Sequence, residues 1–138
     1  MNKILPLSLA VSGAIVILSG IIIFHFLVIA GIVPFGIVWG GNLADKTQLY
    51  TMEAVSIAIN AVMLFIILIY SGVIKLNMNQ KIIMGAIWIM FGIFLLNTLG
   101  NLLAKNALET YIFTPLTLIL SICCFRMATF KKQHQKLS

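Results

Sequence analysis

The chain has 138 residues, of which 62% are hydrophobic and 9% are charged, whereas a typical soluble domain has roughly 25% charged residues. A soluble fold of this size could not bury so much apolar surface, and the length suits one domain of four spans of about 20 residues each. The composition therefore predicts an all-α integral membrane protein, a four-helix transmembrane bundle over residues 1–138.

The formal net charge is +6, and its placement along the chain decides what it means. The basic residues stand at the ends of apolar runs and in the C-terminal tail. This placement is typical of membrane topology signals and of contact with anionic lipids. Membrane lipid is therefore an expected partner, and nucleic acid is not.

The first apolar stretch is longer than one span needs, because no residue from 4 to 44 carries a formal charge. Pro34, flanked by glycines, is the strongest helix breaker in it. We therefore expect a first span over about residues 5–29, followed by a Pro/Gly-broken segment, kinked or re-entrant, over residues 31–41. A cleaved signal peptide is the disfavoured alternative, because the apolar run continues too far and no A-x-A-like site closes it.

Three further spans are expected over about residues 49–73, 82–103 and 108–128. The first two of these contain uncharged stretches long enough to cross a bilayer. The last is short between its charged residues Glu109 and Arg126. It crosses fully only if the Arg126 side chain extends to the membrane interface.

The charged residues then predict the orientation of the bundle. The end with both termini and the loop between the second and third spans holds seven basic residues and no acidic one: Lys3, Lys75, Lys81, Arg126, Lys131, Lys132 and Lys136. The other end holds two basic and three acidic residues. By the positive-inside rule both termini are cytoplasmic, and we expect a multi-pass plasma membrane protein with N-in/C-in topology.

Polar side chains gather in the outer halves of the predicted spans, whereas the inner halves are nearly pure Ile, Leu, Val, Phe and Met. Polar groups inside a membrane are costly unless they face each other, a cavity or the interface, so they indicate where function lies. Residues three and four apart share one helix face, which aligns the polar positions of the second span. We expect an outward-facing ligand-binding pocket lined by Glu53, Asn60, Asn97, Asn101, Lys105, Glu109, His25 and Trp39.

Each of these residues also has a structural interpretation. Asparagine and threonine often join membrane helices by hydrogen bonds, and Glu53 and Glu109 stand near helix starts, where a carboxylate suits the helix dipole. Trp39 fits an aromatic belt at the membrane surface, and a lone histidine such as His25 is often a bundle or interface residue. For the cluster as a whole, a functional role and a structural role are equal alternatives.

No metal, cofactor or enzyme motif is visible in the sequence. His134 lies at the opposite end of the predicted bundle from His25, and Cys123 and Cys124 are adjacent rather than at C-x-x-C spacing. There is no nucleophile elbow, H-E-x-x-H or P-loop. We therefore expect no metal, no cofactor and no catalysis, and we keep an intramembrane enzyme as a third hypothesis.

In size and number of spans the chain is similar to the small multidrug resistance transporters, which work as dimers and carry a membrane glutamate in their first span. Here the first span has no carboxylate, and Glu53 lies near the outer end of the second, so that function is not carried over.

The favoured hypothesis is a binding protein for a small polar ligand, a lipid head group or a partner helix. The alternative is an oligomeric small transporter or channel subunit with Glu53 as its ionisable coupling residue. A transporter should place Glu53 and Asn60 on a water path that continues past mid-bilayer, whereas a binding pocket should be closed from inside by the apolar halves.

Overall fold

The computed structural model describes residues 4–39 and 44–130, and within these ranges all regular structure is helical. In chain order its elements are α1 (Leu7–Ile29), the 3₁₀ turn η1 (Phe35–Ile37), α2 (Lys46–Ser71), α3 (Gln80–Leu102), the π-helical turn η3 (Glu109–Phe113) and α4 (Thr114–Thr129). η3 and α4 run on as one helix over Glu109–Thr129. The prediction of four helices long and apolar enough to cross a membrane is confirmed for the described residues, with ends within about one turn of those expected.

Local sequence accounts for several helix ends. The Asp45 carboxylate accepts a hydrogen bond from the backbone N–H of Gln48 at 2.8 Å, which caps the start of α2. Asn79 caps α3 in the same way through the N–H of Lys81, at 2.9 Å. α2 ends at Gly72, whose φ of 81° lies in the left-handed region that glycine adopts without strain.

After α1 the chain turns rather than continuing as a helix. Gly31, with φ of 75°, and Pro34, which precedes η1, carry the chain across the end of the bundle. The loop is held there by a small buried apolar cluster made of Val28, Val38 and Leu49. The last two residues of the expected broken segment, 40 and 41, lie outside the described residues.

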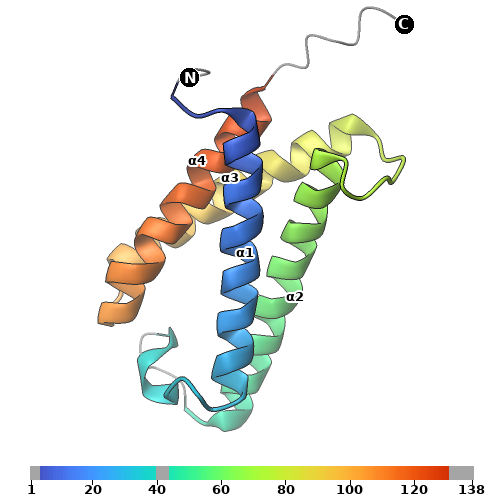
Figure 1. Cartoon of the computed structure of the whole chain (residues 1–138). Helices are drawn as coiled ribbons and strands as arrows, with labels where there is room; N and C mark the ends of the chain where they lie inside the picture. Colours follow the sequence, from blue (N-terminus) through green and yellow to red (C-terminus); the bar gives the residue numbers. More distant parts are fainter. Residues whose placement is uncertain (1–3, 40–43, 131–138) are drawn as a thin grey trace, which may run out of the picture.

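The helices form two pairs that diverge toward one end (Figure 1). α1 packs on α2 and α4, and α3 packs mainly on α4, whereas α2 and α3 contact each other much less. The start of α1 and the end of α4 lie at the same end of the bundle, together with the loop that joins α2 to α3 (Figure 1). The loops after α1 and α3 lie at the opposite end, where the pairs stand furthest apart.

The main apolar core lies in the half of the bundle nearer the described ends of the chain. Its members come from all four helices and include Ala14, Leu18, Met63, Ile67, Ile87, Met90, Leu120 and Cys124. Both cysteines are buried and unbonded, so the structure gives them a packing role. The buried core therefore fills the centre of this half of the bundle.

Arg126 lies in the last turn of α4, and the structure gives it partners that the sequence did not suggest. Its side chain is 4% exposed, its Nε donates a hydrogen bond to the Leu5 carbonyl oxygen at 2.9 Å, and its guanidinium lies 5.1 Å from the centre of the Phe130 ring. The chain before α1 offers a carbonyl that no helical N–H satisfies, and a charged donor binds such an acceptor strongly. Arg126 thus ties α4 to the segment that leads into α1.

Candidate functional site

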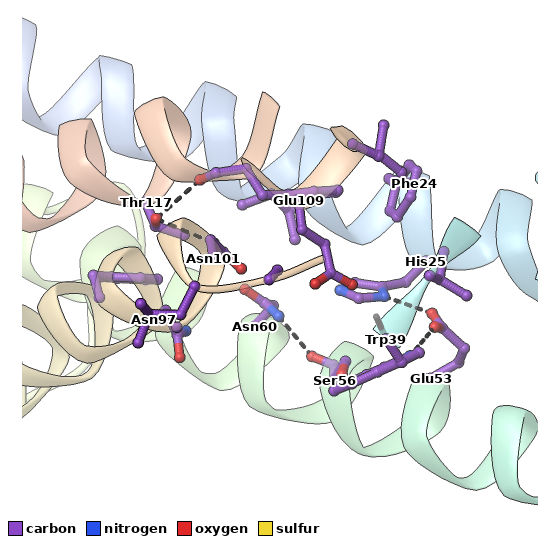
Figure 2. Close-up of a pocket in the computed structure, with 18 of the residues that line it drawn as sticks. Phe24, His25, Trp39, Glu53, Ser56, Asn60, Asn97, Asn101, Glu109 and Thr117 are labelled. Atoms are coloured by element: carbon purple, nitrogen blue, oxygen red, sulfur yellow. Dashed lines mark hydrogen bonds and ion pairs between the residues drawn. The ribbon is translucent and has the colours of Figure 1, made fainter. Parts of the chain in front are cut away.

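A cavity of about 530 Å³ opens between the two helix pairs at the end opposite the described chain ends. The end of α1, the first half of α2, the end of α3 and the start of η3 all contribute to its wall, as does the loop that carries Trp39 (Figure 2). The structure brings together all the residues singled out from the sequence, because the lining includes His25, Trp39, Glu53, Asn60, Asn97, Asn101, Lys105 and Glu109.

Glu53 is the most enclosed charged group of the cavity wall, with only 1% of the residue exposed. One carboxylate oxygen lies 2.5 Å from His25 Nδ1, and the other accepts a hydrogen bond from the indole N–H of Trp39 at 2.7 Å (Figure 2). A carboxylate only accepts hydrogen bonds, so His25 donates through Nδ1. A buried charge is tolerated when it is hydrogen-bonded in this way, and the three side chains hold one another in place.

The loop after α1 positions Trp39 by an unusual backbone conformation. Trp39 has φ of 54°, in the left-handed region that bulky residues rarely adopt. Such strain persists only where surrounding contacts hold it, and here Trp39 packs against the buried cluster around Val38 while its indole reaches Glu53. The strained residue is thus the one that brings the loop into the site.

Two asparagines are oriented by the protein itself. Asn60 donates from its amide nitrogen to the Ser56 carbonyl oxygen at 2.8 Å, and Asn101 donates to the Thr117 hydroxyl at 3.4 Å. Thr117 also accepts from Thr98 at 2.9 Å, which joins α3 to α4 beside the cavity. The hydrogen bonding of these side chains therefore supports the structural interpretation of asparagine and threonine, and it leaves the two amide oxygens for the cavity.

Glu109 enters the cavity wall at the first residue of η3. The N–H of Thr114 bonds to the Glu109 carbonyl, five residues back, as a π-turn requires. Pro115 follows directly, and a proline removes the N–H that would bond four residues back and crowds that carbonyl, which favours a wider turn. Figure 2 shows the Glu109 side chain pointing toward the ring of His25.

The remaining two candidates, Asn97 and Lys105, are exposed residues of the lining, one in α3 and one in the loop after it. Lys105 is the only lysine of the described lining, against two glutamates.

Sequence reasoning missed the aromatic part of the wall. Phe24 and Phe113 line the cavity, and their rings meet edge to face with centres 4.9 Å apart. Both stand in apolar runs where a phenylalanine is ordinary, so only the position of Phe24 next to His25 in the chain indicated the site. The cavity thus combines polar atoms with flat apolar faces, as ligand sites usually do.

The inner end of the cavity is closed. Ile21 and Phe94 form part of its lining, and the buried core side chains Leu18, Met63 and Met90 follow toward the other end of the bundle. Among the described residues no group of three or more His, Cys, Asp or Glu side chains is placed to hold a metal ion.

No family model, curated protein or solved structure matches this chain.

Proposed function

We propose that this chain is an integral protein of the plasma membrane, with both termini cytoplasmic and the cavity facing outward. The surface of the helices supports insertion, since large apolar side chains such as Val16, Ile89 and Leu96 are 65–70% exposed over the bundle's flanks. The orientation rests on the positive-inside rule. Lys75 and Lys81 mark the cytoplasmic end within the described part of the chain, and the other lysines of that end lie outside it.

We further propose that the protein binds a small polar or amphipathic ligand in this cavity. The observation that carries the proposal is the convergence of polar side chains from every long helix on one cavity of about 530 Å³ that ends against apolar core. Asparagines that only joined helices would not require an open space beside them. A carboxylate held in place by two donors is ready to accept a hydrogen bond from a ligand without rearrangement. Binding rather than catalysis is the function this arrangement supports best.

A closed inner end also favours binding over transport. A transporter should extend the water path from Glu53 and Asn60 through the bundle, whereas core side chains fill the inner half. The transporter alternative would require the two helix pairs to move apart there.

The test is a comparison of two carboxylate-to-amide changes. Glu53→Gln alters the cavity wall, and Asp45→Asn makes the same chemical change at a helix cap outside the cavity lining, where asparagine also caps well. The protein in phosphatidylcholine nanodiscs is exposed to ethanolamine, choline, glycerol, acetate and phosphate, and thermal unfolding is measured. We expect at least one compound to raise Tm of the wild type and of Asp45→Asn but not of Glu53→Gln. The same change in Tm for all three proteins, or no change in Tm for any of them, would contradict the binding proposal.

A further inference from the structure

The cavity offers hydrogen-bond acceptors more than donors. Because the Ser56 carbonyl can only accept, the amide nitrogen of Asn60 must face it, and the amide oxygen is left for the cavity. The same reasoning applies to Asn101, since the Thr117 hydroxyl donates to the Phe113 carbonyl at 2.9 Å and so accepts from Asn101. Figure 2 shows both asparagine side chains beside the same space.

Two carboxylates add to these oxygens. Glu53 has both oxygens engaged by His25 and Trp39, yet a carboxylate has about four acceptor positions. Glu109 points toward the same His25 ring, and Phe24, Trp39 and Phe113 complete the wall (Figure 2). Carboxylate and amide oxygens together with aromatic faces suit a cationic group that donates hydrogen bonds, and an ammonium group does both.

A second, purely apolar groove lies further along the same two helices, toward the inner end of the bundle. It measures about 360 Å³, and its lining includes Ile59, Val62 and Ile66 of α2 and Ala86, Ile89 and Ile93 of α3. Ile93 lies one helical turn before Asn97 of the polar cavity, on the same face of α3, and Met63 lies one turn beyond Asn60.

The groove is open to the surroundings of the bundle. Val62 and Ile89 on its walls are 59% and 65% exposed, because α2 and α3 pack loosely against each other. From Ala58 to Ile66 it extends roughly 12 Å along α2, close to the depth of one leaflet of a bilayer about 30 Å thick. A polar cavity followed by a groove of that length matches a molecule with a head group and a hydrocarbon chain.

We propose that the ligand is a lipophilic amine, with its ammonium group among the oxygens of Asn60, Asn101 and Glu109 and its hydrocarbon chain in the groove between α2 and α3. This inference rests on the proposed binding function and specifies its ligand class. Lys105 does not oppose it, because Lys105 is an exposed residue of the loop after α3, where solvent and salt screen its charge. The polar cavity thus recognises the charged head, and the groove between α2 and α3 recognises the apolar chain.

The experiment uses Trp39 as the reporter. The chain has two tryptophans, and Trp88→Phe leaves Trp39, within the cavity wall, as the only one. The fluorescence of Trp39 is followed in phosphatidylcholine nanodiscs as dodecylammonium, butylammonium, dodecanol or dodecanoate is added. The amount of each compound is expressed as its mole fraction in the bilayer or as its free concentration. We expect saturable binding of dodecylammonium at a mole fraction at least tenfold lower than for dodecanol or dodecanoate.

Groove-filling variants test the position of the chain. Ala58→Phe and Ala86→Phe place a ring in the groove from either wall, and Ala61→Phe is the matched control, an exposed alanine of α2 that lines neither cavity. Overfilling a packed site typically costs enough to weaken binding about tenfold. We expect that loss for dodecylammonium in both groove variants, and unchanged butylammonium binding in all three. Circular dichroism checks that each variant keeps its helices.

The outcomes separate this inference from the function on which it rests. Equal binding of dodecanol or dodecanoate would overturn the ammonium head group, and groove variants that bind dodecylammonium like Ala61→Phe would overturn the position of the chain. If ethanolamine or glycerol binds in a Glu53-dependent manner while dodecylammonium does not, the cavity still binds a ligand and the lipophilic class is wrong. If no probe of either experiment binds, both proposals fail.

Discussion

Replacing Glu53 with leucine should destabilise the bundle, although a charge is removed from its interior. The carboxylate accepts hydrogen bonds from Trp39 at 2.7 Å and from His25 at 2.5 Å, and it is 1% exposed. Leucine is shorter by one atom and has no acceptor, so both donors would lose their partner. Glutamine keeps one acceptor for the indole and an amide that can meet the imidazole, so Glu53→Gln is the matched control.

The magnitude follows from the two donors left behind. A buried donor without a partner costs about 1–3 kcal/mol, and two of them would cost about 2–6 kcal/mol. Two effects reduce this loss. Leucine has no charge whose burial costs free energy, and water that enters from the cavity can accept hydrogen bonds from the two donors. We therefore expect Glu53→Leu to lower the free energy of unfolding by about 2–4 kcal/mol, and Glu53→Gln by about 1 kcal/mol or less.

The assay is equilibrium unfolding in mixed micelles, with helical content as the signal, for Glu53→Leu, Trp39→Phe and the double variant. If the indole N–H is held by Glu53, the two changes should be non-additive by about 1–2 kcal/mol, since each removes the same hydrogen bond. Additive effects, or a Glu53→Leu protein as stable as the Glu53→Gln protein, would refute the hydrogen-bonded cluster.

Three further predictions concern other parts of the chain. Arg126→Met, which keeps much of the packing volume but removes the donor to Leu5, should lower the free energy of unfolding by about 1.5–3 kcal/mol in the same assay; an unchanged value would contradict the buried tie between α4 and the start of the chain. Gly72→Ala should lower the thermal midpoint, because alanine at φ of 81° costs about 1–2 kcal/mol, whereas a raised midpoint would contradict this helix end. Single cysteines at Lys46 and Lys75 should react with an impermeant maleimide from outside and from inside respectively, and reversed labelling of intact cells would overturn the orientation.

The helices were the easiest part of the fold to predict, because long uncharged apolar runs separated by charged loops admit few alternatives. The membership of the cavity was also predictable, since polar residues such as Asn60 and Asn101 shared a depth and an end of the bundle. The contacts that join these residues could not be predicted. The contacts of Glu53 with His25 and Trp39 depend on how α1 and α2 are rotated and on the path of a loop between them, which no periodicity encodes.

Arg126 shows a second kind of contact that the sequence does not reveal. A charged residue near the end of an apolar run suggests a side chain that extends toward water, because that choice costs least when nothing polar is near. The structure adds a hydrogen bond to the Leu5 carbonyl, and that partner lies 121 residues away in the chain. Such long-range hydrogen bonds cannot be read from local composition.

The π-turn at the start of the last helix limits how this chain can vary in length. A π-turn closes its hydrogen bond over one residue more than an α-turn does, so η3 holds the equivalent of one inserted residue between the loop and Thr114. Deleting a single residue there would restore regular α-geometry, with a hydrogen bond over four residues in place of five, and the side chains on either side would keep nearly the same faces of the helix. Glu109 would then still face the cavity while α4 stayed in place. A further residue inserted in regular α-geometry would instead rotate every side chain before it by about 100° about the helix axis. We therefore expect this turn to tolerate the loss of one residue but not a further insertion.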